Sequence, residues 1–584
     1  MKEKIDLSAL FKSDKDAKKE LISLKKYAKN ISNYEGKILS NPEMLYEYLE
    51  YDNEISKRLE RLYLYAHINN DLDLTNENYN EMLGNVLNFL NELSEKESYV
   101  VPELLEKDYK FVKEYIKKFP KLKEYENNLK SIYRAKKYIK SKEEEKIITL
   151  LTSVYSKSED ASEMLLTTDM DFGTITDEEG KIVPLTISNF STYIRSSNQN
   201  VRKEAFLKFY KEIKHYENTF NTIYTTKVMS NNKVAKLRGF KSARSLSLYS
   251  NDIKNDIYDN LINGIKNNLP KFYDLKKKVL GLDKLHLYDT YANITKDFDK
   301  KYSYDEAKKL VISSLEVMGN SYVEVIKKAF SDNWIDVYPK KNKRDGGYCT
   351  CAYLAHPYVV INYEGKLDDV STLIHELGHA MHYYYAQNFN TYEDYNYSIF
   401  VAEVASQVNE IILTNYMLNH TDNIEEKKYI LDSILQRFKA TMIRQTMFAH
   451  FEDNLHNKEM NGTVLTKELV QKEYLDLNKL YFGPNVEVDE DIKYECYRIP
   501  HFYYNFYVYQ YATGYAAALK IANDIINKKD GALENYIKFL KLGSTLDPVK
   551  SLKVAGVDIE SPSLYDEVFE FFDEKRKELE SLYE

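Results

Sequence analysis

Apolar residues recur at intervals of three and four along most of the chain, and this pattern predicts a protein built mainly from α-helices. Between about residues 7 and 165, charged segments carry apolar residues at this spacing, as at Leu59 and Leu62, which is typical of helices that bury one face. The pattern resumes near residue 200 and continues to the C-terminus, with a break at 483–491. We therefore expect a mainly α fold, with the early helices packed as antiparallel pairs.

Two segments interrupt the helical pattern and indicate β-structure. Residues 170–185 hold two short runs rich in Thr, Ile and Val, and the polar stretch 177–180 separates them. Such an arrangement is typical of a β-hairpin. We place a boundary near this hairpin, between an N-terminal helical lobe over residues 1–195 and a second region over residues 196–584.

The second segment begins with two adjacent glycines, Gly346 and Gly347, and continues into the apolar run 357–363. The glycines predict a loop that is free to move, and the apolar run predicts a strand. We expect this strand to present an exposed edge, along which an extended peptide can pair through its main chain.

Charge and composition exclude several classes of protein. The 82 basic and 91 acidic residues give a net charge of -9, and both signs are mixed along the chain, so nucleic acid is not an expected partner. No run of about 18 apolar residues predicts a membrane helix, and the first twenty residues lack the apolar stretch of a secretory signal. Three cysteines, an odd number, fit a reducing compartment. We therefore expect a cytoplasmic protein that does not associate with membranes.

His375, Glu376 and His379 form the pattern H-E-x-x-H. Two imidazoles one helical turn apart can bind the same zinc ion, and the Glu between them is placed to act as a general base toward water. The composition predicts only about 0.03 such patterns by chance in a chain of this length. The sequence therefore predicts one zinc ion held by His375 and His379, with Glu376 as the catalytic base.

A catalytic zinc ion takes three protein ligands, so a third ligand must lie outside the pentad. His382 shares the helix face of the two histidines, but three histidines along one straight helix close poorly around a tetrahedral ion. Glu403 belongs to the next helical segment, 398–418, where it forms a polar stripe with Gln407 and Glu410. The residues alone leave both His382 and Glu403 open as the third ligand.

The pentad and the three residues after it, followed by the segment 401–407 (Val-Ala-Glu-Val-Ala-Ser-Gln), resemble the zinc-binding core of the thimet oligopeptidase family. The resemblance is closer to its bacterial oligoendopeptidase F branch, continues at 346–348, 498–503 and 511–515, and covers roughly residues 200 to 584. It implies that Glu403 is the third zinc ligand. It also implies a two-lobed helical bowl that encloses a deep substrate channel, with a small β element beside the active site.

The resemblance further implies that His501 and nearby tyrosines stabilise the oxyanion formed during attack, with Tyr507 and Tyr511 as the best matches. Tyrosine is concentrated in this part of the chain: residues 494–515 hold eight, where the overall content of 53 in 584 predicts about two. Four of these tyrosines are expected to share one face of a single helix: Tyr504, Tyr507, Tyr511 and Tyr515.

These observations predict a zinc-dependent endopeptidase that hydrolyses short to medium unfolded peptides, with residues 196–584 as its catalytic region. One alternative is a zinc carboxypeptidase or dipeptidase of similar helical fold, and another is an inactive peptide-binding protein. A metzincin is disfavoured, because its third histidine follows the second by six residues, where this chain has Tyr385.

Overall fold

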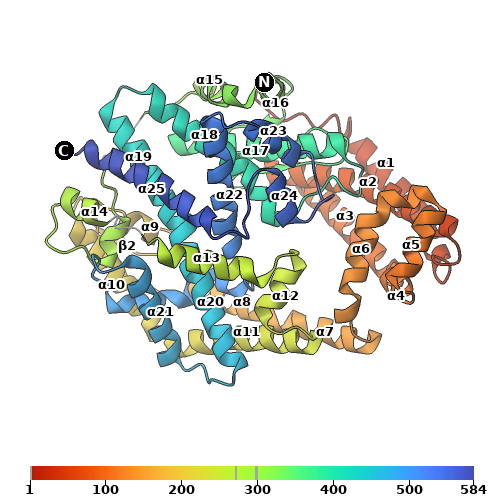
Figure 1. The fold of residues 1–584 in the computed structure, drawn as a ribbon, viewed down its shortest axis with the longest axis horizontal. Coiled ribbons are helices and arrows are strands. Elements are labelled where there is room, and N and C mark those ends of the chain that lie inside the picture. The colour runs from red at the N-terminus through yellow and green to blue at the C-terminus, as the bar shows by residue number, and fades with distance from the viewer. Residues whose placement is uncertain (1–2, 270–272, 296–299) are drawn as a thin grey trace. The chain divides into compact units, whose positions relative to one another are not determined.

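A computed structural model of the protein describes residues 3–269, 273–295 and 300–584 (Figure 1). The chain forms two compact units, each assembled from three stretches of sequence. The first contains Met1–Lys137, Asp299–Tyr416 and Ile521–Val557, and the remaining stretches form the second. Helices dominate both units, so the predicted mainly α fold class is confirmed. The two-lobed bowl, its channel and the boundary at residue 195 stay predictions.

Helices of the first unit begin where the sequence offers capping groups. At the start of α2, for example, Asn41 accepts a hydrogen bond from the backbone N–H of Met44, and Pro42 occupies the first turn. The helices of this unit are α1 (Asp14–Tyr27), α2 (Pro42–Leu72), α3 (Glu77–Lys96), α4 (Val100–Leu105), α5 (Tyr109–Lys118), α6 (Glu126–Ala135), α15 (Tyr304–Ser314), α16 (Asn320–Ser331), α17 (Leu367–Phe389), most of α18 (Ile399–His420), α23 (Ala532–Leu540) and α24 (Pro548–Val554).

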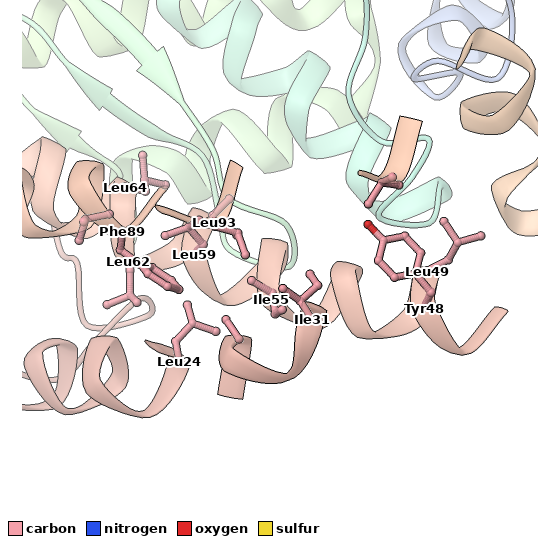
Figure 2. Packing of buried hydrophobic residues seen from close by; sticks show 14 of the residues in the cluster. Leu24, Ile31, Tyr48, Leu49, Ile55, Leu59, Leu62, Leu64, Phe89 and Leu93 are labelled. Carbon is pink, nitrogen blue, oxygen red and sulfur yellow. The ribbon is translucent and has the colours of Figure 1, made fainter. Parts of the chain in front are cut away.

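The N-terminal helices of this unit bury a continuous apolar cluster (Figure 2). Leu24 of α1, Leu59 and Leu62 of α2, and Phe89 of α3 belong to it, as the three-and-four spacing predicts. The cluster also includes Val360, which lies in the strand that precedes the H-E-x-x-H helix. The N-terminal helices and this strand therefore share one core.

A three-stranded sheet packs against α17 and consists of β3 (Ile335–Asp336), β4 (Tyr348–Thr350) and β5 (Tyr358–Val360). β5 lies in the centre, parallel to β3 and antiparallel to β4. The strand predicted within 357–363 is thus confirmed. Its predicted exposed edge is wrong, because β3 and β4 occupy both edges of β5 and all three residues of β5 are buried. β4 is therefore one of the two outer strands of this sheet.

The second unit contains the predicted hairpin. β1 (Thr174–Thr176) pairs antiparallel with β2 (Ile182–Pro184), and this prediction is confirmed. The helices of the unit are α7 (Lys142–Tyr155), α8 (Lys157–Met164), α9 (Phe190–Tyr193), α10 (Gln199–His215), α11 (Glu217–Arg238), α12 (Ala243–Ser250), α13 (Asn255–Asn267), α14 (Tyr273–Val279), α19 (Ile424–Phe438), α20 (Gln445–Met460), α21 (Lys467–Phe482), most of α22 (Tyr509–Ile526) and α25 (Ser563–Ser581).

A buried carboxylate organises the interior of the second unit. Glu495 is fully buried, accepts hydrogen bonds from the hydroxyls of Tyr210 and Tyr474, and pairs with Arg444 and Arg498. Burial alone raises the pKa of Glu495, but the two guanidinium groups outweigh it and lower the pKa to about 2. Arg498 thereby anchors the start of the segment that leads to His501.

Within the described ranges, none of the helices has both the length and the apolar composition that a membrane crossing needs.

Candidate metal centre

The pentad lies in the middle of α17, which is positioned by its first turn and by one buried face. Asp369 accepts hydrogen bonds from the backbone N–H groups of Glu364 and Lys366 and fixes the start of the helix. The two imidazoles keep some exposure, 25% for His375 and 14% for His379. An apolar stripe is buried along the helix: Val370, Ile374, Leu377, Met381 and Tyr385.

Glu403 of α18 brings its carboxylate to the two imidazoles. Its Oε2 atom lies 3.4 Å from Nε2 of His375 and 3.7 Å from Nε2 of His379, and ligand atoms of all three residues lie within 4.8 Å of one another. Two ligand atoms bonded at about 2.0–2.1 Å to a tetrahedral ion are roughly 3.3 Å apart. The carboxylate therefore lies at nearly the distance from each imidazole that a shared zinc ion requires. Two imidazoles with one carboxylate are a donor set that suits zinc.

Glu410 holds the imidazole of His375 in orientation. Nδ1 of His375 lies 2.6 Å from Oε1 of Glu410, and the Ser371 hydroxyl donates to the other carboxylate oxygen at 3.0 Å. A hydrogen bond at Nδ1 fixes the tautomer and leaves Nε2 free to bind a metal. The sequence pattern places Glu410 on the stripe of Glu403 but assigns it no role. Its position seven residues after Glu403 places it two helical turns away on the same helix face, and this spacing could have indicated that Glu410 also lies near the metal site.

The other two candidate ligands are also held by neighbours. The ring of His379 is hydrogen-bonded to the backbone carbonyl of Ala402. The hydroxyl of Ser406, which is fully buried, lies 3.1 Å from Oε2 of Glu403. Each of the three candidate ligands thus has a polar neighbour that favours its orientation toward the site.

Gly378, inside the pentad, is the point at which α17 and α18 make backbone contact. A Cβ atom at this position would lie 2.5 Å from Cα of Ser406 and 2.7 Å from the carbonyl oxygen of Ala405. Only glycine permits such an approach. Because Glu403 lies one turn before Ser406 on α18, this contact also determines how near Glu403 comes to the histidines.

Glu376 points into a less accessible environment than the histidines that flank it, and only 6% of it is exposed. Burial raises the pKa of Glu376 to about 7, and the nearby carboxylate of Glu403 adds to this rise. His375 and a hydrogen bond from the backbone N–H of Cys349 lower the pKa and oppose the rise. Cys349 lies in β4, so the outer strand of the sheet supports this carboxyl. A carboxyl with a pKa near neutrality can accept a proton and return it.

His382, the other ligand that the residues left open, lies outside the group of ligand atoms. It is buried, and its ring stacks on Tyr397 with the ring centroids 3.5 Å apart. Burial lowers the pKa of His382 to about 3, so the ring is neutral near pH 7. Its surroundings are those of a core side chain.

The loop before β4 contacts two helices. Nε of Arg344 lies 2.8 Å from Oδ1 of Asp71, a buried residue of α2. A Cβ atom at Gly347 would lie 3.0 Å from Cγ2 of Thr372 in α17, so this glycine packs closely against the metal-site helix. The predicted freedom of this loop to close stays a prediction.

His501, Tyr507 and Tyr511 lie in the second unit, where their rings meet. Together with Tyr504 they form what we call the ring cluster: the ring centroids are 5.8 Å apart for His501 and Tyr511, 5.4 Å for Tyr507 and Tyr511, and 5.5 Å for His501 and Tyr504. Burial lowers the pKa of His501, which favours the neutral ring.

The prediction that four tyrosines share one face of a single helix is wrong. Helix α22 begins only at Tyr509, and left-handed backbone at Asn505 and Phe506 separates Tyr504 from the start of this helix. Tyr515 is buried and its ring lies 6.4 Å from that of Phe438. It is therefore a core residue and does not belong to the ring cluster.

The chain is similar to known peptidases. Residues 192–571 match the model of peptidase family M3, and residues 103–172 match that of oligopeptidase F. The chain is 38% identical to oligopeptidase PepF of Bacillus subtilis, over 99% of this chain and 86% of that protein. It is 36% identical to an oligoendopeptidase F homolog of Borreliella burgdorferi, over 100% and 98%. The structure of oligoendopeptidase F from Enterococcus faecium superposes with a TM-score of 0.75 at 31% identity, covering 98% of this chain and 99% of that one.

Proposed function

Because the chain belongs to peptidase family M3 and is a metalloendopeptidase, we propose that it hydrolyses short to medium unfolded peptides at a single zinc ion held by His375, His379 and Glu403. The observation that carries this proposal is the distance of Oε2 of Glu403 from the two Nε2 atoms, 3.4 Å for His375 and 3.7 Å for His379. These values lie close to the separation of about 3.3 Å in a tetrahedral zinc site.

A zinc ion held by His375, His379 and Glu403 would supply Lewis acidity toward water and the scissile carbonyl. Glu376 acts as the general base: its carboxylate takes a proton from the attacking water and passes it to the nitrogen of the leaving amine. The support for this role is its position between the two histidine ligands and its burial next to them. Glu410 and Ser406 keep His375 and Glu403 oriented throughout.

The ring cluster provides hydrogen-bond donors in this proposal. His501, Tyr507 and Tyr511 stabilise the oxyanion that forms when water attacks the peptide carbonyl, and each donor contributes on the order of 2–4 kcal/mol to the transition state. The assignment is supported by the resemblance of this segment to the family, in which Tyr507 and Tyr511 are the best matches. It is also supported by the contacts that the ring of Tyr511 makes with the rings of His501 and Tyr507.

A blocked peptide of about ten residues tests the proposal. The zinc-loaded wild type should cut it internally, with products identified by mass spectrometry, whereas Glu376→Gln should bind zinc normally and leave the peptide intact. Glu364→Gln, at an exposed residue before α17, is the matched control and should cut like the wild type. Trimming of free peptides without any cut in blocked ones would replace the proposal with a carboxypeptidase or dipeptidase. Intact peptides of both kinds would favour a peptide-binding protein.

A further inference from the structure

The ring cluster is assembled around a turn with rare backbone geometry. Asn505 has a φ of +53° and Phe506 a φ of +58°, and both values lie in the left-handed region that residues with side chains seldom adopt. Two such residues in succession reverse the chain between Tyr504 and Tyr507. The reversal is what brings rings from before and after the turn into contact, because without it Tyr507 would continue away from His501.

Side chains from two helices hold this turn in place. Oε1 of Glu452, in α20, accepts a hydrogen bond from the backbone N–H of Phe506 at 2.7 Å. The hydroxyl of Ser247, in α12, donates to the carbonyl of Asn505 at 2.7 Å. The ring of Phe506 is buried and lies 4.7 Å from the ring of His456. The strained backbone is thus retained by contacts from outside its own segment, as strained turns require.

Glu452 occupies an environment that is unfavourable for a carboxyl. It is fully buried, and among the described residues its Oε2 atom has no hydrogen-bond partner. Burial raises the pKa of Glu452 to about 8; Phe506 N–H and Lys227 oppose the rise, and Asp453 adds to it. An apolar residue would pack here at lower cost, but it would leave the N–H of Phe506 without an acceptor.

We propose that Glu452 is a positioning residue of the peptidase reaction, which places the oxyanion donors Tyr507, Tyr511 and His501 together by holding the left-handed turn at Asn505 and Phe506. This inference rests on the donor role of the ring cluster in the proposed function. Glu452 acts through the backbone and makes no contact with substrate in this scheme.

Two substitutions of Glu452 separate positioning from general stability. Glu452→Ala removes the acceptor and should lower kcat on a blocked peptide by roughly 10- to 100-fold with KM changed less than about threefold, because the donors act on the transition state. Affinity for a phosphinic peptide, which resembles the tetrahedral intermediate, should fall by the same factor. Glu452→Gln keeps an acceptor oxygen and should restore kcat to within about threefold of the wild type.

Further variants decide the outcome if Glu452→Ala folds poorly. Ser247→Ala should give a smaller fall in kcat, about threefold, again at constant KM. The matched control is Tyr258→Phe, which removes a buried hydrogen bond to the carbonyl of Ala449 beside the turn and should lower the Tm without lowering kcat.

Equal losses in the Gln and Ala variants, or an unaltered kcat in folded Glu452→Ala, would overturn the positioning role while leaving the donor role intact. The donor role is tested separately by Tyr507→Phe and Tyr511→Phe. If neither substitution lowers kcat, the donor assignment fails and the positioning role fails with it.

Discussion

Replacement of Gly378 by alanine should weaken zinc binding in a protein that still folds. The added Cβ would lie 2.5 Å from Cα of Ser406, whereas carbon atoms in contact prefer about 3.5–4.0 Å. Helices α17 and α18 must therefore separate by about 1 Å at this point. Glu403 moves with α18, and a displacement of this size exceeds the tolerance of about 0.5 Å for a functional site.

The magnitude follows from the loss of one properly placed ligand. Disturbing only the groups that orient zinc ligands costs 10- to 100-fold in affinity, so a displaced ligand should cost at least about 100-fold, or about 2.7 kcal/mol. Overpacking adds a loss of stability of about 1–3 kcal/mol. Zinc affinity is measured by competition with a chromophoric chelator, and stability by urea unfolding of the zinc-free protein.

Two other glycines provide matched controls for this experiment. Gly264→Ala is equally crowded, with Tyr565 side-chain atoms from 2.5 Å, but Gly264 belongs to the other unit. It should lower stability and leave zinc affinity unchanged. Gly84→Ala lies in α3 with open space around the new Cβ, and should raise stability by about 0.4–1 kcal/mol. A Gly378→Ala protein with the zinc affinity of the wild type would refute the geometric reasoning.

Three further results are expected. Glu410→Ala should lower zinc affinity about 10- to 100-fold, because His375 loses its partner at Nδ1. Glu410→Gln keeps an acceptor and should lose less affinity. Equal losses of zinc affinity in the two variants would contradict an orienting role. Glu452→Gln should become increasingly more stable than the wild type as the pH rises from 4.5 to 8, by about 1.4 kcal/mol per pH unit. The reason is that Glu452 loses its carboxyl proton near pH 4.5 in the unfolded wild type, whereas the folded protein keeps this proton until about pH 8. Urea unfolding at several pH values is the measurement. A difference in unfolding free energy between the two proteins that stays constant with pH would contradict the burial of the carboxyl. Removal of zinc by a chelator should lower the Tm, and each tenfold increase in free zinc above Kd should raise the free energy of unfolding by about 1.4 kcal/mol; a Tm that does not depend on zinc would argue against a site in the folded protein.

The sequence predicts those features that depend on neighbouring residues. The helices, the hairpin and the pentad all follow from local spacing. The edge predicted for 357–363 is wrong because the place of a strand in a sheet depends on its partners, here Ile335 and Tyr348, which no local pattern reveals. The third ligand stayed open between His382 and Glu403 for the same reason: only the packing of α17 on α18 separates a buried ring from an accessible carboxylate.

The turn at Asn505 and Phe506 is a further feature that local patterns conceal. Tyrosines at three-and-four spacing suggest a continuous helix, but the acceptor that stabilises the turn, Glu452, lies more than fifty residues earlier in the chain. The position of Glu410, in contrast, could be predicted from local spacing, because it lies on the same helix face as Glu403 and both side chains therefore point toward the metal site.

One contact of the site comes from the peptide group and not from a side chain. The hydrogen bond that the β4 strand gives to Glu376 is donated by the main-chain N–H of residue 349, so exchanging the cysteine for serine or alanine leaves the donor in place. Alanine scanning therefore cannot detect this contact, because any residue other than proline at position 349 donates the same hydrogen bond. Only a backbone replacement, such as an ester in place of this amide introduced by semisynthesis, can show what the contact contributes to the basicity of Glu376.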